Sequence, residues 1–328
     1  MRSVAVFVAA LAVLLPFSAP SASENALMQP STLPFGAPPF DRIQDTDYLP
    51  AFQAGMAQHL KEIEAIANNA APPTFDDTFV AMEKSGRLLT RASNAFDAVA
   101  QANTNPTLQH TREVIAPMLA AHEDAIYLNP KLFARVRTIY AQLPHLNLDA
   151  ESRRLVQVYY DDFLHAGAQL APAQQAKLRE INKQLAVLRA DYQRKVLAGT
   201  AAGALTVTDK SKLSGLNDSA IAASEAAAKA KQDPAGYLIA LQNTTQQPAL
   251  AQLNDRTTRQ QLFENSWTRN EKSDQNDTRS TIAQIAKLRA EKAHLLGYPN
   301  YAAYALTQEM ARTPGTVQTF LHGLIGAT

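Results

Sequence analysis

The chain contains seven histidines, and their spacing shows whether a helical zinc motif is present. A motif of the H-E-x-x-H type places two histidines four residues apart, so that both ring nitrogens face one ion from one side of a helix. His122-Glu123 begins in this way, but Ile126 stands where the second histidine would be. Because cysteine is absent, thiolates cannot replace the missing ligands, and a site built from distant His, Asp and Glu is the remaining alternative. The seven are His59, His110, His122, His145, His165, His294 and His322.

Asp161, Asp162 and His165 fall within about one helical turn of each other. A carboxylate one turn from an imidazole can orient and charge it, which is the composition of an acid–base or weak metal site. The same spacing is ordinary on a solvent-facing helix surface, with Tyr159 and Phe163 turned toward the core. We favour the structural interpretation, and we assign no catalytic residue and no metal ligand to this chain.

Two further groups of polar residues have the composition of a peptide-binding site. Gln242–Pro248, which we expect to be a loop, begins with six consecutive amide or hydroxyl side chains, which could bind an extended peptide or satisfy backbone groups at a strand end. We favour the second interpretation. Arg279, Arg289 and Lys292 precede a glycine, and we expect them to pair with Glu291 or with acids on other helices. The substrate-binding residues therefore remain unknown at this level.

Composition excludes several other classes of function. The sequence has no G-x-S-x-G elbow, no G-x-x-x-x-G-K-[ST] loop and no G-x-G-x-x-G turn. Aromatic residues make up 7% of the chain and do not alternate with basic runs, so the pattern of single-stranded nucleic-acid binding is missing. With a net charge of +1, there is no electrostatic reason to expect nucleic acid or anionic lipid as a partner.

Residues 1–23 have the pattern of a secretory signal peptide. Arg2 precedes an apolar run of 12 residues, Val4–Leu15, and small residues follow the run. Such a run is too short to span a bilayer, and a short membrane anchor is the less favoured alternative. We expect cleavage between Ala22 and Glu24 and an exported, periplasmic product with no membrane association. Removal of this segment would leave 30 basic and 30 acidic residues.

Hydrophobic periodicity predicts a mainly α fold. Glycine is scarce (12 residues), and long stretches repeat apolar residues with the helical period. One helix is expected to begin at Asp47, and another to run from about Thr74 to Val99, with Gly86 marking a close helix crossing. Further helices are expected after Asn105-Pro106, Asn129-Pro130 and Asp149. The longest follows Pro172, where Leu178, Ile181, Leu185, Leu188 and Tyr192 predict a seam between long antiparallel helices.

The pattern changes near residue 204, where we place a boundary between a region 24–204 and a region 205–328. Leu205–Thr208 and Gly236–Leu241 read as short strands on either side of an alanine-rich helix from about Asp218 to Lys231. The small β element is therefore expected near residues 205–242. Helices resume at Asn254 and from about Asp277, Gly297 ends the latter, and Asn300 and Thr313-Pro314 begin two more. The last helix carries an apolar face, Val317, Phe320, Leu321 and Leu324.

Several segments resemble the zinc metallopeptidases of the thimet oligopeptidase and peptidyl-dipeptidase family. The most informative is the helix–glycine–helix segment Leu288–Leu306 with the following Met310–Pro314, which is shared widely across the family. Others are Leu33–Asp41, Ala70–Phe75, Glu83–Gly86, Leu128–Phe133, Leu241–Pro248 and Ser266–Arg269. Among these, Leu33–Asp41 is similar to the peptidyl-dipeptidase (dipeptidyl carboxypeptidase) branch. The resemblance extends over nearly all of the expected mature chain.

The resemblance implies a deep channel between two mostly helical halves, with this chain as the N-terminal half and one channel wall. Members bind one zinc ion through H-E-x-x-H and a later glutamate, and the motif's own glutamate activates the zinc-bound water. Enzymes of the peptidyl-dipeptidase branch release dipeptides from the C-terminal end of oligopeptides. Since none of the metal or catalytic residues has a counterpart in this sequence, zinc is expected in the complete enzyme and not in this chain.

Two hypotheses follow. In the first, the chain is the N-terminal part of an exported peptidyl-dipeptidase, inactive without its C-terminal catalytic half; the parent enzyme could instead be an endo-acting oligopeptidase. In the second, the chain is a non-catalytic periplasmic helical module that binds peptides or a partner protein.

Overall fold

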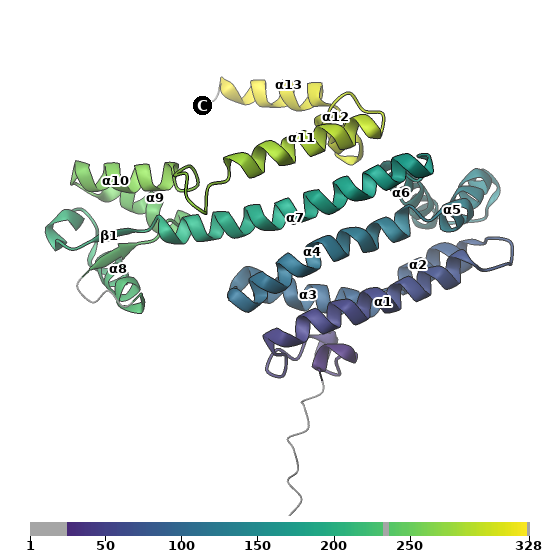
Figure 1. Ribbon diagram of the computed structural model, residues 1–328, viewed down its shortest axis with the longest axis horizontal. Helices are drawn as coiled ribbons and strands as arrows, with labels where there is room; N and C mark the ends of the chain where they lie inside the picture. Colours follow the sequence, from purple (N-terminus) through teal and green to yellow (C-terminus); the bar gives the residue numbers. More distant parts are fainter. Residues whose placement is uncertain (1–24, 232–235, 327–328) are drawn as a thin grey trace, which may run out of the picture.

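The computed structural model describes residues 25–231 and 236–326, and helices dominate it (Figure 1). The predicted signal peptide, residues 1–23, lies outside the described residues. The helices are α1 Tyr48–Ala67, α2 Ala81–Lys84, α3 Arg87–Ala102, α4 Pro106–Tyr127, α5 Pro130–Gln142, α6 Ala150–Ala166, α7 Pro172–Ala202, α8 Asp218–Ala230, α9 Asn243–Gln252, α10 Arg256–Trp267, α11 Arg279–Leu295, α12 Tyr301–Ala305 and α13 Pro314–Ile325. Among the described residues, none of these helices has the length and hydropathy needed to cross a bilayer.

The predicted mainly α fold with a small β element is confirmed. Strands β1 Leu205–Val207 and β2 Tyr237–Ile239 pair antiparallel, with Thr206 opposite Leu238. The alanine-rich helix α8 lies between them in the sequence, as predicted, and packs against β2. Figure 1 shows the two strands with α8, α9 and α10 gathered at one end of the long helix α7.

Helix boundaries follow the capping residues in the sequence. Each cap side chain accepts a backbone N–H of the first turn, which leaves fewer unpaired groups at the helix start. Two glycines with left-handed backbone, Gly167 (φ +96°) and Gly297 (φ +85°), follow the ends of α6 and α11, where β-carbons are disfavoured. The caps that were predicted and are present are Asn105, Asn129, Asp149, Asn300 and Thr313.

Helix α7 lies between α4 and α11 and runs antiparallel to both (Figure 1). Asn182, near its start, bonds to Asp124 near the end of α4, whereas Arg194, near its end, pairs with Glu113 near the middle of α4. The predicted seam is present from Leu178 to Leu188, but Tyr192 is 38% exposed because the packing of apolar side chains gives way to ion pairs there.

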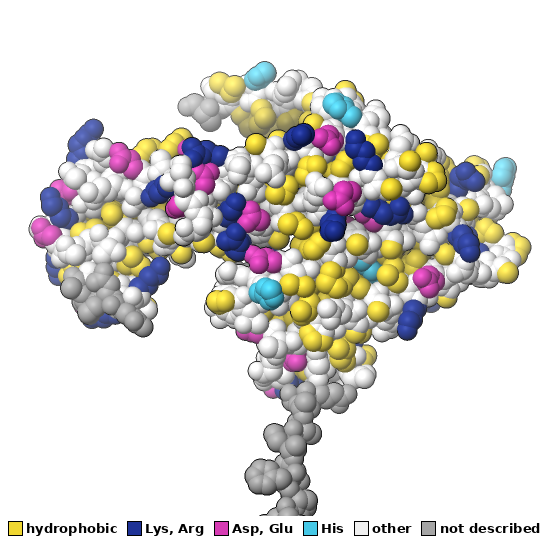
Figure 2. All heavy atoms as spheres, in the orientation of Figure 1, with side chains coloured by type: hydrophobic (Ala, Val, Ile, Leu, Met, Phe, Trp, Pro, Cys, Tyr) yellow, Lys and Arg dark blue, Asp and Glu magenta, His cyan; other side chains and the backbone are white. Residues whose placement is uncertain are grey.

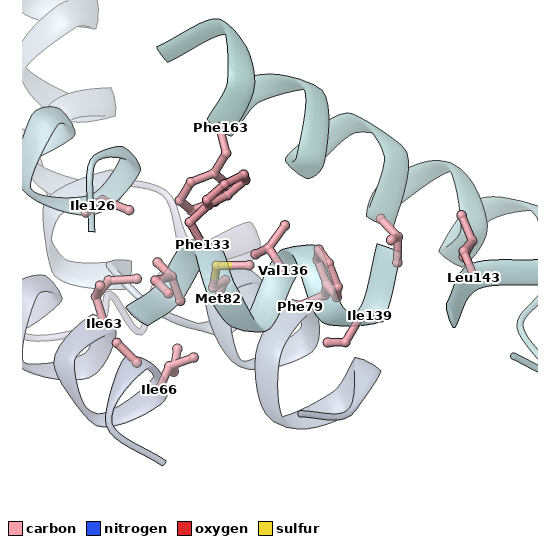
Figure 3. Packing of buried hydrophobic residues seen from close by; sticks show 13 residues of the cluster. Ile63, Ile66, Phe79, Met82, Ile126, Phe133, Val136, Ile139, Leu143 and Phe163 are labelled. Carbon is pink, nitrogen blue, oxygen red and sulfur yellow. The ribbon is translucent and has the colours of Figure 1, made fainter. Parts of the chain in front are cut away.

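Two hydrophobic cores hold the region before α7 together. One is built from α1, α2, α5 and α6 around Phe79, Phe133 and Phe163 (Figure 3). The other joins α1, α3 and α4, where Phe96 meets Tyr48 and Phe52 edge to face at ring distances of 5.3 and 5.5 Å. A third, smaller core lies under the two strands and includes Leu205, Ile239, Leu213 and Leu262, among others.

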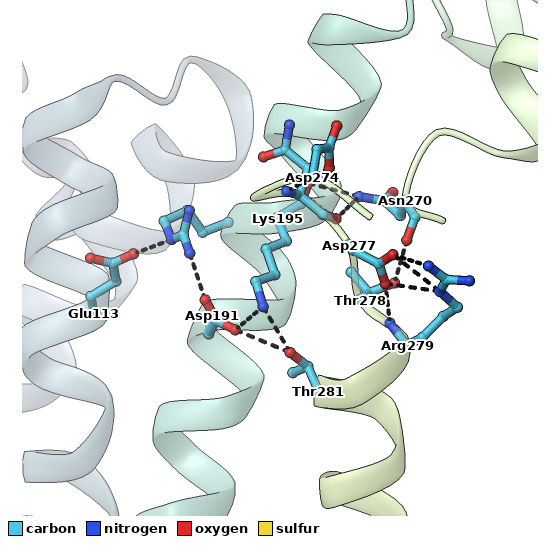
Figure 4. Close-up of polar contacts among 11 residues, drawn as sticks. Glu113, Asp191, Lys195, Asn270, Asp274, Asp277, Thr278, Arg279 and Thr281 are labelled. Carbon is cyan, nitrogen blue, oxygen red and sulfur yellow. Dashed lines mark hydrogen bonds and ion pairs between the residues drawn. The ribbon is translucent and has the colours of Figure 1, made fainter. Parts of the chain in front are cut away.

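A polar cluster fixes the segment before α11 against α7 (Figure 4). The Asn270 amide donates to the carbonyls of Lys195 and Asn276, at 3.0 and 2.8 Å. The Lys195 ammonium contacts Asp191 at 2.9 Å and Thr281 Oγ1 at 3.0 Å. Because these bonds satisfy backbone groups at the end of α7, they set where α11 begins and hence where its far end lies.

Two local predictions were wrong. The helix expected from Thr74 to Val99 breaks at Gly86, whose left-handed backbone (φ +69°) places its N–H on Glu62 at 2.7 Å. Gly86 does lie close to α1, since a β-carbon there would meet the His59 ring at 2.9 Å, and α1 and α3 also approach closely at Gly55, where a β-carbon would meet the Leu89 backbone at 2.8 Å. Gln242–Pro248 is not a loop, because Asn243 begins α9 and the Gln242 carbonyl accepts the first helical hydrogen bonds.

Helix α13 begins at the predicted cap but keeps its apolar face open. Phe320 is 66% exposed and Leu321 is 52% exposed. Figure 1 places the helix at the outer edge of the molecule, beyond α11. The predicted division into a region 24–204, which forms one channel wall, and a region 205–328, which leads into the absent catalytic region, stays a prediction.

Replacement of Phe163 by alanine is expected to lower the free energy of unfolding by about 3–5 kcal/mol, because the ring is fully buried and its removal leaves a cavity among aromatic neighbours. Urea denaturation of the purified chain measures this. Phe320→Ala is the matched control, with an expected change within about 0.5 kcal/mol because the ring is exposed. Equal losses in both variants would contradict the assignment of the core.

Candidate functional site

Three adjoining cavities line one face of the helical region. The inner cavity (about 480 Å³) lies among α1, α3, α4 and α6, the central cavity (about 230 Å³) among α4, α6, α7, α11 and α12, and the outer cavity (about 470 Å³) between α6 and residues 298–312. Glu123 and Tyr127 border both the inner and the central cavity, and Asp162 and His165 border both the central and the outer cavity. Shared walls make the three cavities a continuous row.

The turn between α11 and α12 brings Tyr304 onto His165. Gly297 ends α11 and the Asn300 side chain caps α12, so the chain reverses within a few residues. The two rings stack at 4.0 Å with an angle of 7°. His165 Nε2 lies 3.1 Å from the Tyr304 carbonyl, and since a carbonyl only accepts, Nε2 carries the hydrogen.

A charge pair bridged by an amide forms the floor of the central cavity. The Asn182 amide donates to Asp124 Oδ1 at 2.7 Å, and Asn182 Oδ1 accepts from the Lys292 ammonium at 2.8 Å. Burial raises the pKa of Asp124 and lowers the pKa of Lys292, and their mutual attraction opposes both shifts. The ammonium also lies 5.6 Å from the Tyr304 ring centre. One asparagine therefore links α4, α7 and α11 beneath the cavity.

Two histidines and a serine form a directed chain of hydrogen bonds beside the inner cavity. Ser85 donates to the Met82 carbonyl at 2.6 Å, so its oxygen must accept from His59 Nε2–H at 3.1 Å. His59 Nδ1 is then a bare acceptor, and it receives the hydrogen of His122 Nε2 at 2.9 Å. His122 Nδ1 is left as an acceptor, and it has no partner among the described residues.

Burial and, to a smaller extent, the neighbouring His59 together lower the pKa of His122 to about 4. The pKa of His59 is also lowered by burial, although Glu62 acts in the opposite direction. Both rings are therefore neutral near pH 7, as the hydrogen-bond chain requires. Tyr159, on the opposite wall, donates to Glu83 at 2.6 Å, and burial together with this carboxylate raises the pKa of the phenol.

The predicted acid–base group is present on α6 but does not act as a unit. Asp162 accepts from Gln308 at 2.7 Å, His165 bonds to Tyr304, and Asp161 remains exposed. Phe163 is buried and Tyr159 packs against the same core, as the structural interpretation predicted. What differs is that Asp162 and His165 border cavities and contact residues well over a hundred positions away.

The predicted cationic side chains are dispersed. Arg279 pairs with Asp277 at the start of α11, and Lys292 bonds to Asn182 rather than to Glu291. Arg289 lies over the Tyr301 ring at 4.9 Å. The segment Gln242–Pro248 does not border this row of cavities. Only Lys292 of the three cations reaches it.

Sequence reasoning missed the His59–His122 pair and the Tyr304–His165 stack. The two histidines are 63 positions apart and on different helices, so no local pattern reveals them. Within residues 25–231 and 236–326, no three His, Cys, Asp or Glu side chains are grouped so that they could hold a metal.

Comparison with known proteins gives one consistent family. Residues 249–328 match the model of peptidase family M3. The chain is 45% identical over 303 residues to a dipeptidyl carboxypeptidase of Salmonella typhimurium and 44% identical to that of Escherichia coli, over 92% of this chain. Oligopeptidase A of Escherichia coli is 26% identical over 302 residues. The chain spans about 45% of the length of these curated relatives.

Gly86→Ala is expected to destabilise the chain more than Gly297→Ala. Both glycines have positive φ, so each substitution carries the left-handed penalty of about 1 kcal/mol. Only at Gly86 does the added carbon also meet a neighbour, the His59 ring at 2.9 Å; nothing lies within 4 Å at Gly297. Thermal and urea unfolding compare the two. A larger loss at Gly297 would refute the close approach of the His59 ring.

Stability is expected to fall between pH 6.5 and about 4 because of His122. The unfolded state binds a proton near pH 6.5 whereas the folded state resists it until about pH 4, so the free energy of unfolding rises with pH across this window. The contribution is up to about 3 kcal/mol. Urea denaturation at pH 7 and pH 4.5 is compared in wild type and His122→Gln, which keeps a donor toward His59. The variant should show a flatter pH dependence, and an unchanged dependence would count against the buried neutral ring.

Proposed function

We propose that the chain belongs to peptidase family M3 and is the N-terminal part of an exported, zinc-dependent peptidyl-dipeptidase. The complete enzyme would hydrolyse oligopeptides and release dipeptides from their C-terminal end. The observation that carries this proposal is the 45% identity to a dipeptidyl carboxypeptidase over 92% of the chain, against 26% to oligopeptidase A. That difference favours the dipeptide-releasing branch.

In this proposal the residues described above bind and orient the peptide. The row of cavities presents acceptors such as Glu123 and Asp162 beside donors such as Arg154 and Lys292, which suits a peptide backbone that has both. Individual cavities of this size accept side chains or small ligands. Most of the lining residues lie on helices, which position side chains more precisely than loops do.

Zinc, when bound in the complete enzyme, would supply the activated water for hydrolysis. The described residues of this chain do not fit that role, since they contain no suitable ligand group. No step of the reaction is therefore derived through the metal at this wall. In this proposal the residues of this chain bind and orient the peptide and exclude water from it.

Two alternatives are retained. The first alternative is that the complete enzyme is an endo-acting oligopeptidase, which the 26% identity to oligopeptidase A supports. The cavities would also suit a non-catalytic periplasmic module that binds peptides. Export itself is proposed from the pattern of residues 1–23 alone.

A chimaera tests the function. Residues 25–328 replace the matching part of the Escherichia coli dipeptidyl carboxypeptidase, which the chain covers to 44% of its length. We expect the chimaera to release dipeptides from the C-terminal end of an N-blocked hexapeptide, identified by mass spectrometry, and this chain alone to give no turnover above background. The E. coli protein lacking that part is the control and should be inactive.

Product analysis separates the alternatives. Cleavage at internal bonds, without dipeptide release, would replace the proposal by an endo-acting oligopeptidase. A folded chimaera that binds the hexapeptide but does not cleave it would favour the non-catalytic module. Turnover by this chain alone would contradict the proposal that this chain binds the peptide while the metal site lies in the rest of the enzyme.

A further inference from the structure

The lining of the inner cavity includes one acidic side chain, Glu123, and no lysine or arginine. Glu123 is exposed to solvent on one side. Burial and the neighbouring Asp124 raise the pKa of Glu123, whereas Lys292 and Arg189, which lie outside the lining, lower it. A cavity with one carboxylate and no cation attracts a positively charged ligand and disfavours an anion.

The walls suit a ligand that is apolar along its length. Ile63, Met82 and Leu119 form one part, and the ring of Tyr127 forms another; the fully buried Phe163 supports this ring from behind at 5.0 Å. Aromatic faces also attract cations. A long alkyl chain that ends in a charge buries its methylene groups on such walls and keeps its charged end near the polar rim.

His122 adds a second acceptor. The hydrogen-bond chain from His122 through His59 and Ser85 to the Met82 carbonyl leaves His122 Nδ1 as a lone pair without a donor. The residue is only 5% exposed, and a buried acceptor without a donor is unfavourable. The cavity thus offers two acceptors, Glu123 and His122, and the ligand that satisfies both must donate hydrogen bonds.

We propose that the inner cavity is a subsite for the side chain of a basic residue, lysine or arginine, in a bound peptide. The methylene groups would lie on the apolar and aromatic walls, and the ammonium or guanidinium group would donate to Glu123 and, at the cavity wall, to His122 Nδ1. Since Glu123 also borders the central cavity, the peptide backbone would continue from there into the row described above. The peptide nature of the ligand rests on the proposed function.

A simpler occupant is a water molecule. Ser93 and Asn94 also line the cavity, and a water bonded to one of them could supply the donor that His122 lacks. Such a water would satisfy the imidazole without any preference for a cation. The two occupants therefore predict different ligand preferences and different behaviour of the His122 ring.

Binding of small probes to the full 328-residue chain tests the proposal at pH 7. The probes are n-pentylammonium, n-pentylguanidinium, 1-pentanol and pentanoate, and titration calorimetry measures each affinity. We expect the two cations to bind about tenfold more tightly than pentanol, the difference between a charge-assisted and a neutral hydrogen bond, and pentanoate to bind most weakly. Nitrogen-15 NMR of the imidazoles should show a shift at His122 Nδ1 on saturation with the cation.

Two variants and one control assign the preference to the residues. Glu123→Gln should bring the affinities for the cations and pentanol close together, and His122→Gln should weaken cation binding while leaving a preference over pentanol. Glu151→Gln, an exposed acid on α6, should behave as wild type. Because Glu123 is exposed, its substitution should leave the melting temperature unchanged, so a loss of binding is not a loss of folding.

Equal affinity for pentylammonium and pentanol would overturn the proposal. So would a preference that survives Glu123→Gln, or a His122 Nδ1 signal that is already hydrogen-bonded and unmoved by saturating cation, which is the outcome for a resident water. None of these measurements requires peptide cleavage. An inactive chimaera together with cation binding would therefore reject the enzymatic function alone, and an active chimaera without cation binding would reject the subsite alone.

Discussion

The central cavity depends on how α7 is held between α4 and α11. At one end, Asn182 accepts from Lys292 and donates to Asp124, so an ammonium and a carboxylate on outer helices are joined through a neutral amide on the middle one. At the other end, Arg194 and Lys195 share Asp191 and reach Glu113 and Thr281. An amide that both donates and accepts satisfies two buried charges at once, which neither a carboxylate nor an ammonium could do in that position. The floor of the central cavity and the register of three helices thus have the same cause.

The charged side chains on the visible surface form no patch of one sign that could attract a ligand. Figure 2 shows lysine and arginine interspersed with aspartate and glutamate along the visible face, in keeping with a net charge of +1. Exposed pairs of this kind contribute little to stability and are screened by salt. Discrimination between ligands must therefore come from inside the cavities, where a single carboxylate or lone pair acts in a less polar environment.

Local rules predicted the elements of the fold better than their arrangement. Asparagine followed by proline marks the starts of α4 and α5 because the cap and the fixed proline backbone act within one turn. The same rules failed at Gly86 and at Gln242, where contacts with distant residues determine the secondary structure. Glu62 accepts the Gly86 N–H, and helix α9 packs on the small β core. We interpreted Asp161, Asp162 and His165 as a solvent-facing helix surface, and of the three Asp161 is exposed. The positions of Asp162 and His165 at the cavities could not be predicted from the sequence. Their partners, Gln308 and Tyr304, lie more than a hundred residues further along the chain.

The His59–His122 pair shows why a binding site in a helical wall is harder to predict than a helix. Each imidazole has two nitrogens whose roles depend on the partner of the other, so the protonation of His122 is set by Met82, three links away in the chain of hydrogen bonds. At the end of α2 the Met82 carbonyl accepts from both the N–H and the hydroxyl of Ser85, just before the left-handed Gly86. The atom that the cavity wall presents therefore depends on a chain of contacts among α1, α2 and α4, which no local pattern in the sequence reveals.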